Sequence, residues 1–502
     1  MADWSGSAGP IPTPAAVKGR PDIGDENVAT ALRPAQIRVA HRPQPRCLLL
    51  LFLYRSYPMQ NLLAFTDQTS WLLLRATGQG PVIQCVWVYE RAVDLDGVRR
   101  FHRNLGLGLL GRRIECSPLP FARHRWVSCP APSAIDIADR PRPRAELSAW
   151  ADERGQLVVD PQLGPGWHLG VAAFTDGSAA VSLVASHTLV DGMGLCRAIA
   201  DAVLGATPQL GYPPPHSRTR TRAVLQDAYQ TARDAPQAAR ALATAAHVVR
   251  RRRAGGARSR ASSPVAIRRG AAHRGAPAIS IYIDLDDWDY RAKSLGGTSN
   301  SLFAGFAAKL AERSGFHDAA AGTVRISFPV SDRIEGDTRA NALSFVIVDV
   351  EPARVTTTLR EVRGAISREL QTLRETPEEL LGLLALSPFT PKRVARKLAE
   401  TAYGYPDVGC SNLGDLDPAV GRPDGTDADR VFIRGLRQQL TPQGFERPRG
   451  ILLVSGRIGA KIFITVVAYH LAAKNPTPGA EPNLRELAAH TLAEFGLTGV
   501  ID

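Results

Sequence analysis

Short apolar runs between turn-forming residues recur along the chain and predict β-strands. The clearest is 82–89, which reads VIQCVWVY directly after Gly80-Pro81. Two further runs, 168–174 and 179–185, flank the turn Thr175-Asp176-Gly177 and predict a hairpin. The same pattern predicts strands over 279–285, 323–330, 343–350, 430–434, 450–454 and 461–468, the last two paired across a glycine turn.

Other segments place apolar residues three or four positions apart and predict helices. In 94–105 the apolar positions are Leu95, Val98, Phe101 and Leu105, with basic residues between them. The same spacing predicts helices over 192–204, 300–313, 357–373 and 483–495. Strands and helices therefore alternate, which is typical of a mixed α/β (α+β) fold. We expect two comparable subdomains, 59–205 and 276–502.

The segment 206–275 separates these halves and carries most of the charge. It holds 14 arginines and two aspartates, a net +12 of the +13 of the whole 502-residue chain. Its alanine-rich middle, 223–249, predicts a helix, whereas the proline and glycine at its edges predict loose chain. We interpret 206–275 as an Arg-rich linker.

The run Arg250–Arg253 in this linker could indicate nucleic-acid binding. Single-stranded nucleic acid is bound by basic side chains interleaved with stacking aromatics. The only aromatics of 206–275 are Tyr212 and Tyr229. We therefore expect no specific nucleic acid, and favour a solvated linker that contacts the anionic headgroups of a membrane surface.

The first 58 residues differ from the rest because they are rich in proline and show little periodicity. Their one apolar run, 47–54, is too short to cross a bilayer, which takes about 20 residues. It also lies too far from the N-terminus to be the core of a secretory signal. We interpret 1–58 as a disordered extension, or as sequence upstream of a true start at Met59.

Several chemical signatures are absent or misplaced. The six cysteines form no C-x-x-C pair, so we expect no disulfide framework or zinc module, but reduced thiols in the cytoplasm. The segment 106–111 matches G-x-G-x-x-G, yet a predicted helix precedes it where a dinucleotide site needs a strand, so a helix-ending turn is expected. Neither a Gly-Lys dipeptide nor G-x-S-x-G occurs, which argues against a P-loop and a hydrolase elbow.

The most informative segment is 186–192, which reads SHTLVDG and contains H-x-x-x-D-G. His187 follows a predicted strand that would fix its imidazole, and Asp191 stands where a helix begins and a carboxylate is favoured. Gly192 leaves space beside the ring. Two other interpretations remain open: a core histidine with an ordinary helix cap, and a metal pair, for which no third ligand is evident.

With this motif the sequence resembles the CoA-dependent acyltransferase superfamily, which includes chloramphenicol acetyltransferase, condensation domains and the wax ester synthase/diacylglycerol acyltransferases. Three further stretches are similar to the wax synthase and polyketide-associated branches: FPVSDR at 328–333 with Asn341, CSNLG at 410–414, and the opening 62–67. One departure is that many members carry two histidines, H-H-x-x-x-D-G, and in this chain Ser186 occupies the first of these positions.

The resemblance implies two chloramphenicol acetyltransferase-like subdomains, each a mixed sheet with helices, facing each other across a substrate tunnel. His187 would be the general base, since imidazole can accept and return a proton near neutral pH. Asp191 would be structural and paired with Arg112 or Arg113. The resemblance also implies oxyanion or tunnel roles for the polar residues Ser331, Asn341, Ser411 and Asn412. No metal or other cofactor is implied.

We therefore predict an O-acyltransferase of lipid or polyketide-derived lipid metabolism. Its partners would be an acyl-CoA or acyl-carrier protein as donor and an alcohol or lipid as acceptor. The expected location is the cytoplasm, peripherally at the inner membrane surface through the Arg-rich linker. The alternatives are a condensation-type amide synthase of nonribosomal peptide metabolism and a catalytically silent carrier-docking member.

Overall fold

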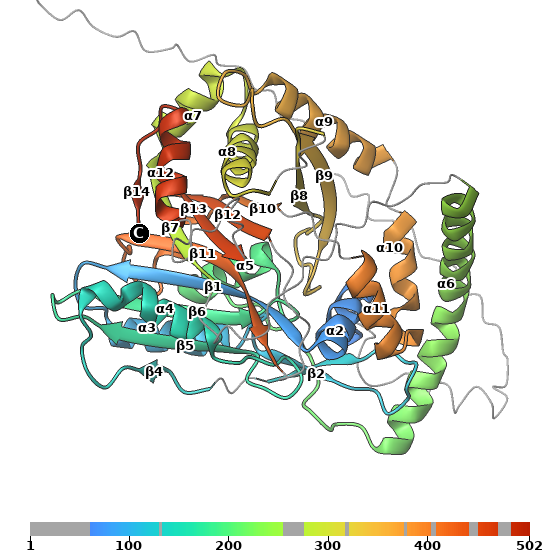
Figure 1. Ribbon diagram of the computed structural model, residues 1–502. Coiled ribbons are helices and arrows are strands. Elements are labelled where there is room, and N and C mark those ends of the chain that lie inside the picture. The colour runs from blue at the N-terminus through green and yellow to red at the C-terminus, as the bar shows by residue number, and fades with distance from the viewer. Residues whose placement is uncertain are drawn as a thin grey trace, which may run out of the picture. The chain divides into compact units, whose positions relative to one another are not determined.

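The computed structural model describes most of the chain from residue 61 onward (Figure 1). The described ranges are 61–129, 133–254, 276–316, 321–375, 379–402, 408–440, 450–469 and 483–502. The interpretation of 1–58 as an extension, with Met59 as a possible start, concerns residues outside these ranges. None of the helices within them has both the length and the apolar character needed to span a bilayer.

The first sheet has the strand order β11-β1-β6-β5-β4. Its central strand is β6 (Ala179–Ser186), which pairs antiparallel with β1 (Gln79–Tyr89). The predicted hairpin is present, because β5 (Trp167–Ala173) pairs antiparallel with β6. The short β4 (Asp136–Ile137) closes one edge in parallel with β5.

Helices pack around this sheet and a buried core that includes Trp87, and together they form what we call the first lobe. They are α2 (Phe65–Thr77), α3 (Leu95–Leu105), α4 (Leu147–Gln156) and α5 (Gly192–Leu204). A two-stranded hairpin, β2 (Arg112–Glu115) and β3 (Arg125–Ser128), lies outside the sheet. The segment 106–111 is the predicted turn: Gly106 ends α3, and a Cβ on Gly111 would lie 2.1 Å from the Gly106 carbonyl oxygen.

The second sheet has the order β14-β7-β13-β12-β10-β8-β9. It is mixed, because β10 runs parallel to both its neighbours while the other pairs are antiparallel. Its strands are β7 (Ala278–Asp284), β8 (Val324–Ser331), β9 (Leu343–Val350), β10 (Val408–Asp415), β12 (Gly450–Ile458), β13 (Lys461–Tyr469) and β14 (Val500–Ile501).

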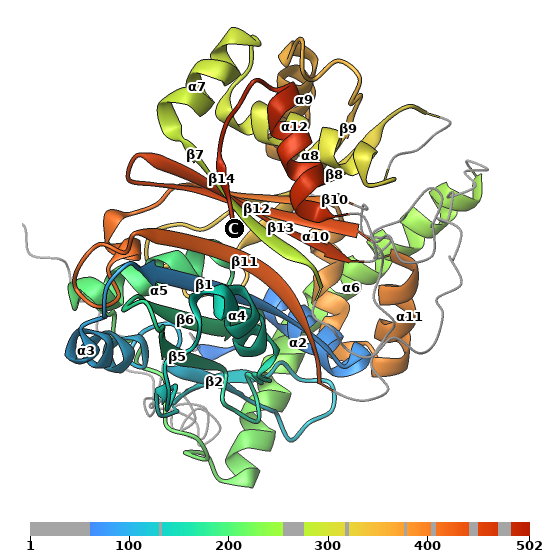
Figure 2. The ribbon, with the colours of Figure 1, turned by 60° about the vertical axis from the view of Figure 1, so that its left-hand side comes forward.

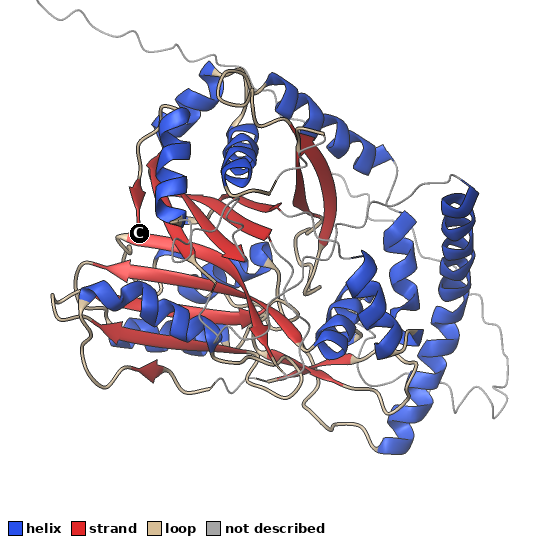
Figure 3. Ribbon diagram, viewed as in Figure 1, coloured by secondary structure: helices blue, strands red, loops and turns tan. Residues whose placement is uncertain are grey.

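Four helices pack against the second sheet and form the second lobe with it. They are α7 (Leu285–Ser294), α8 (Ser299–Arg313), α9 (Arg360–Glu375) and α12 (Leu484–Glu494). α8 packs against α7, α9, α12 and several strands, and its Phe303 and Phe306 are fully buried. Figure 3 shows these helices gathered on the side of the second sheet away from the first. The predicted strands and helices are all present, with β11 and β12 longer than expected, and the mixed α/β class is confirmed.

One strand crosses between the two halves of the sequence. β11 (Arg430–Gln439) belongs to the C-terminal half, yet it pairs with β1 from Gln79↔Gln439 to Val88↔Arg430. Figure 2 shows it between the other strands of both sheets. The Thr465 hydroxyl of β13 donates to the Ile433 carbonyl of β11 at 2.7 Å. The first sheet is therefore completed by residues that lie far beyond 205 in the sequence.

The segment 206–275 contains a helix that is anchored to the first lobe. The predicted helix is present as α6 (Arg220–Ala254). Asp227, only 1 % exposed, forms ion pairs with Arg125 at 2.9 Å and Arg218 at 2.8 Å. Asp234 pairs with Arg123 at 2.8 Å. The described part of this segment is thus more than a loose connection.

α6 also contacts elements from the C-terminal half. These are α10 (Glu379–Leu383) and the 3-10 helix η3 (Leu384–Phe389). The neighbouring α11 (Lys392–Ala402) packs on α2. Figure 1 shows α2, α6, α10 and α11 as one helical group beside the sheets.

Candidate functional site

His187 is the first residue after β6, as the sequence predicts. Its backbone N–H donates to the Pro81 carbonyl of β1 at 2.9 Å, which fastens the turn to the neighbouring strand. The hydroxyl groups of Thr188 and Ser70 lie 3.0 Å apart and connect the same turn to α2. The half-buried imidazole therefore stands on a rigid strand end.

Asp191 begins the helix that follows the turn. It is the N-cap of α5, and its side chain accepts a hydrogen bond from the Gly194 N–H at 2.7 Å. This is the favoured use of aspartate at a helix start, because a carboxylate satisfies a backbone donor that has no partner within the helix. The backbone N–H of Asp191 donates to the Ala340 carbonyl at 2.8 Å, which joins the turn to a loop of the other lobe.

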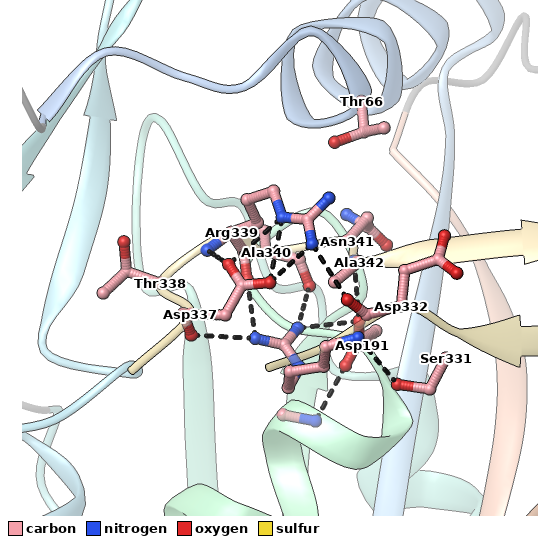
Figure 4. A network of polar contacts seen from close by, with 12 residues as sticks. Thr66, Asp191, Ser331, Asp332, Asp337, Thr338, Arg339, Ala340, Asn341 and Ala342 are labelled. Atoms are coloured by element: carbon pink, nitrogen blue, oxygen red, sulfur yellow. Dashed lines mark hydrogen bonds and ion pairs between the residues drawn. The ribbon is translucent and has the colours of Figure 1, made fainter. Parts of the chain in front are cut away.

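The ionic partner of Asp191, which is labelled in Figure 4, is Arg333. Arg333 Nη2 lies 2.7 Å from Asp191 Oδ2, and the Ala342 N–H donates to the same oxygen at 2.9 Å. The two side chains are 6 % and 0 % exposed. A charge this deeply buried requires such a partner, since desolvating an unpaired carboxylate is very costly. Asp191 is thus a structural element between the lobes.

The prediction that Arg112 or Arg113 pairs with Asp191 is wrong. Arg112 donates to the Leu189 carbonyl at 2.9 Å and lies over the Trp126 ring, 4.0 Å from its centroid. Arg113 stands opposite Val127 in the β2–β3 hairpin. Arg112 therefore supports the His187 turn by a hydrogen bond to the backbone of that turn. The counter-charge of Asp191 comes instead from Arg333, in the loop after β8 of the other lobe.

That loop, 332–342, is folded around the Arg333 guanidinium. Arg333 Nη1 donates to the carbonyls of Asp337 at 3.1 Å and Arg339 at 3.0 Å (Figure 4). Arg339 pairs with the Asp337 carboxylate at 2.6 Å. Burial acts to raise the pKa of Asp337, but the hydrogen bonds from Arg339 outweigh it and hold that pKa below its ordinary value. These contacts hold the loop against the Arg333 guanidinium.

Asn341, at the end of this loop, contacts His187 twice. Its amide nitrogen donates to the His187 carbonyl at 3.1 Å, and its amide oxygen lies 3.0 Å from His187 Nδ1. Because the amide nitrogen faces a carbonyl, the oxygen must face the ring. Nδ1 then carries the proton, and Nε2 carries the lone pair. The sequence placed Asn341 among oxyanion or tunnel candidates; here it orients the imidazole.

Asp67 of α2 holds Asn341 in turn. Its carboxylate accepts from the backbone N–H groups of Asn341 at 2.9 Å and Ala340 at 3.1 Å, and it is fully buried. Burial raises the pKa of Asp67, while the positive charge of Arg112 and the two N–H groups act in the opposite direction. Asp67 was not among the residues that the sequence singled out, because it stands in a polar stretch between Phe65 and Trp71 and belongs to no motif.

Among the described hydrogen bonds, none joins the remaining predicted residues, Ser331, Ser411 and Asn412, to His187. Ser331 ends β8, and its hydroxyl accepts from the Arg333 N–H at 3.3 Å. Ser411 and Asn412 lie on β10; Asn412 accepts from the Gly414 N–H at 2.9 Å and donates to Asn300 at 3.3 Å. A Cβ on Gly192 would lie 3.0 Å from Leu413 Cδ2, so β10 approaches the start of α5. The predicted oxyanion role of Ser411 or Asn412 stays a prediction.

Ser186 directly precedes His187, at the first position of the H-H-x-x-x-D-G pattern to which the sequence was compared. Its hydroxyl accepts from the Thr188 N–H at 3.3 Å inside the turn. Within the described part of the chain, no group of three or more histidine, cysteine, aspartate or glutamate side chains is arranged to hold a metal ion. The five cysteines of those ranges, Cys85, Cys116, Cys129, Cys196 and Cys410, are free thiols.

No model of a protein family matches the sequence, and no curated protein matches it either. Solved structures do match. A wax ester synthase/diacylglycerol acyltransferase from Marinobacter aquaeolei VT8 aligns at a TM-score of 0.50 and 14% identity, over 87% of this chain and 98% of that one.

The first condensation domain of the CDA synthetase aligns equally well. Its TM-score is 0.50 at 14% identity, over 88% of this chain and 99% of that domain. The first condensation domain of the calcium-dependent antibiotic synthetase, in complex with a substrate analogue, aligns at 0.50 and 15%, over 87% of this chain and 95% of that one. The chain therefore shares the two-lobed fold of these acyltransferase and condensation-domain structures, as the resemblance of its sequence predicted.

Proposed function

We propose that the protein is an acyltransferase that moves an acyl group from a thioester to a hydroxyl acceptor, with His187 as general base. The observation that supports this most directly is the pair of contacts between Asn341 and His187. They leave Nε2 of a half-buried histidine as a proton acceptor, and no other group in the described contacts occupies it. A core histidine with an ordinary cap would not need a loop from the other lobe to orient it.

The proposed reaction needs only this one proton carrier. Nε2 takes the proton of the acceptor hydroxyl as its oxygen attacks the thioester carbonyl, and a tetrahedral intermediate forms. When the intermediate collapses, the carbon–sulfur bond breaks and the imidazolium returns the proton to the leaving thiolate. The ester and the free thiol are the products. Ser411 or Asn412 would donate to the oxyanion, while Asp191 and Arg333 hold the site together.

The donor and the acceptor are proposed as classes of compound. The donor is an acyl-CoA or an acyl-carrier protein, and the acceptor is an alcohol or lipid of lipid or polyketide-derived lipid metabolism. The wax ester synthase/diacylglycerol acyltransferase among the solved structures supports a lipid alcohol. The arginines of the 206–275 segment would bring the enzyme to an anionic membrane surface in the cytoplasm.

A second candidate is amide formation between carrier-bound substrates. It is supported by the condensation domains, which align with the same TM-score as the wax ester synthase. The same histidine could then deprotonate an amine. Acceptor preference separates the two functions, because only the second would require an amine acceptor.

The test is transfer by the purified full-length chain. Acyl-CoA and acyl-carrier donors would be incubated with panels of alcohols and amines, and products identified by mass spectrometry. His187→Ala should lower turnover by about 10²–10⁴-fold, the usual contribution of a positioned proton carrier. His490→Ala, at an exposed position of α12, is the matched control and should leave turnover unchanged.

The outcomes discriminate between the proposals. Retention of more than about a tenth of turnover by a folded His187→Ala variant would exclude the general-base role, given the expected contribution. Loss of folding by that variant would instead favour a core histidine. If the wild type binds thioesters but transfers to no acceptor, the protein is a silent docking member.

A further inference from the structure

Strand β9 lies at the edge of the second sheet (Figure 1), and every second side chain along it points away from the core. Val346 and Val348 belong to the core that also holds residues of α8 and α9. On the opposite face, Phe345 and Ile347 are each 50% exposed. Large apolar side chains that are exposed next to each other point to a binding surface.

The neighbouring strand β8 continues this face, because directly opposite residues of an antiparallel pair share one side of a sheet. The opposed pairs on this face are Leu343 with Ser331, Phe345 with Pro329, and Ile347 with Ser327. We call these residues the β8–β9 strip. Its apolar side chains form a row along β9, to which β8 adds only Pro329. From Leu343 to Ile347 the row covers about 13 Å of strand.

One end of the strip adjoins the His187 site. Ser331 ends β8 and Leu343 begins β9, so the loop that carries Arg333 and Asn341 joins these two residues. Asn341 lies two residues before Leu343 and holds the His187 imidazole. Figure 4 shows Ser331 beside the polar network of that loop. The strip therefore begins next to the proposed general base.

The other end of the strip is charged. The next opposed pair along the two strands is Arg325 with Asp349. Arg325 Nε lies 2.9 Å from Asp349 Oδ1, and Arg325 Nη2 lies 3.1 Å from Asp349 Oδ2. Both side chains are largely exposed to water. Hydrocarbon that covered this ion pair would remove its water without replacing the lost hydrogen bonds, which is costly. Apolar contact should therefore end at this pair.

The dimensions of the strip fit one alkyl chain better than a protein partner. Neighbouring strands lie about 5 Å apart, so a single row of apolar side chains is about as wide as one hydrocarbon chain. A stable protein interface buries about 800 Å² on each partner, which is far more than this row can offer. Ser327 and Ser331 flank the row with hydroxyl groups and keep it narrow.

We propose that the β8–β9 strip measures the length of a substrate's alkyl chain, and that the Arg325–Asp349 pair sets the longest chain that is used efficiently. That the chain belongs to a substrate rests on the proposed function, whereas alkyl binding rests on the strip alone. The chain is either the acyl group of the donor or the hydrocarbon of a lipid alcohol. The experiments separate these two sources.

The first experiment measures transfer by the full-length chain as a function of chain length. One series varies the acyl group of an acyl-CoA with a short alcohol as acceptor, and the other varies the alcohol with acetyl-CoA as donor. Ile347→Glu brings a charge two residues nearer the site, about 7 Å, and should lower kcat/KM for the longest accepted chains by about tenfold or more. Transfer between the shortest partners should stay within about twofold of the wild type, because they do not reach the strip.

The double variant Arg325→Leu with Asp349→Leu should act in the opposite direction. It extends the apolar row by one opposed pair, so kcat/KM should rise by about tenfold for chains longer than those that the wild type prefers. Leu242→Ser, at a 63% exposed position of α6, is the matched control and should leave both series unchanged. An edge strand tolerates a charged side chain, so Ile347→Glu should fold. If it does not, the double variant still tests the limit.

The two series decide between the outcomes. A shift in the donor series alone assigns the strip to the acyl group, and a shift in the alcohol series alone assigns it to the acceptor. Chain-length profiles that stay unchanged in both variants would overturn the inference and leave the proposed function intact. An equal loss at every chain length would also overturn it, because the substitutions would then have damaged the site as a whole.

The second experiment needs no turnover. Displacement of the fluorescent fatty acid cis-parinaric acid by fatty acids of increasing length would measure alkyl binding to the full-length chain. Ile347→Glu should weaken this binding by about tenfold or more, and Leu242→Ser should not. Such a loss in a protein that transfers to no acceptor would support the strip and overturn the proposed function. Unchanged binding, together with a dimer of the wild type that Ile347→Glu dissociates, would overturn the inference and make this face an interface between two copies.

Discussion

Asn341 holds His187 from two sides, by its oxygen at the ring and by its nitrogen at the backbone carbonyl. The two residues come from different lobes, and the backbone of Asn341 is fixed by Asp67 from a third segment. The protonation pattern of the imidazole therefore depends on how the lobes are assembled. Residues that touch no substrate should then control the rate.

Asn341→Ala should lower kcat by roughly 10- to 100-fold with little change in KM, because the imidazole loses its orientation but substrate contacts persist. Steady-state kinetics with the full-length chain would measure this. Asn104→Ala is the control. It removes a comparable hydrogen bond, from the side-chain amide to the Ala202 carbonyl at 2.7 Å, outside the site, and should leave kcat unchanged. A rise in KM alone for Asn341→Ala would place this residue in substrate binding instead.

Asp191→Asn should lower the free energy of unfolding by roughly 3–5 kcal/mol, since Arg333 would remain buried without its counter-charge. Urea unfolding of Asp191→Asn, Arg333→Met and the double variant would give the coupling energy. Asp96→Asn breaks an exposed pair with Arg99 and should cost less than about 1 kcal/mol. Unchanged stability of Asp191→Asn with lost turnover would move Asp191 from structure to chemistry.

Two buried histidines should make the fold sensitive to acid. Burial lowers the pKa of His124 to about 4 and that of His168 to about 4, the latter also because of Arg154. In the unfolded chain each histidine takes up a proton below about pH 6.5, whereas in the folded chain it stays neutral down to about pH 4. The free energy of unfolding therefore keeps this contribution above pH 6.5 and loses it as the pH falls to 4. The loss amounts to about 3 kcal/mol for each histidine.

Urea unfolding at pH 7 and pH 5 would measure this effect. His124→Gln and His168→Gln should each reduce the difference between the two pH values, whatever they do to stability at pH 7. His490→Gln, at an exposed position, should not reduce it. An unchanged pH dependence in both buried variants would show that other groups cause the acid sensitivity.

Asp227→Asn should release α6 from the first lobe. The carboxylate is buried and contacts Arg125, Arg218 and the Ser117 hydroxyl, so its neutralisation leaves Arg125 without its counter-charge and Arg218 with only Glu115, at 3.6 Å. We expect a loss of roughly 3–5 kcal/mol and faster proteolysis within 220–254. Limited proteolysis with mass spectrometry would locate the cuts, and cuts elsewhere would show that α6 is held by its other contacts.

The proposal that the protein contacts an anionic membrane surface rests on the arginine run 250–253. Replacing its four arginines with glutamine should weaken binding to anionic vesicles, at about 1 kcal/mol per charge near the surface. Turnover of a soluble acceptor should be unaffected. Flotation with anionic and with neutral vesicles would measure the difference, and equal binding of both kinds by the wild type would exclude a charge-driven contact.

The local sequence pattern was sufficient to predict most of the fold and the position of His187 and Asp191 at the centre of the site. The hairpin β5–β6 and the helix after Asp191 were predictable because each depends on neighbouring residues, periodicity and capping. The partner of Asp191 was not, since Arg333 lies 142 positions away and reaches it through a loop of the other lobe. Asp67 was missed for the same reason: the groups that donate hydrogen bonds to its carboxylate are distant backbone N–H groups, which leave no sequence signature.

The crossing strand β11 has a consequence for how the protein is made. Until residues 430–439 leave the ribosome, β1 has an unpaired edge along ten positions, in a sheet whose other strands are already available. Such an edge can pair with a second chain. A fragment that ends near 205 should therefore aggregate rather than fold, and nascent chains should depend on chaperones until synthesis is nearly finished.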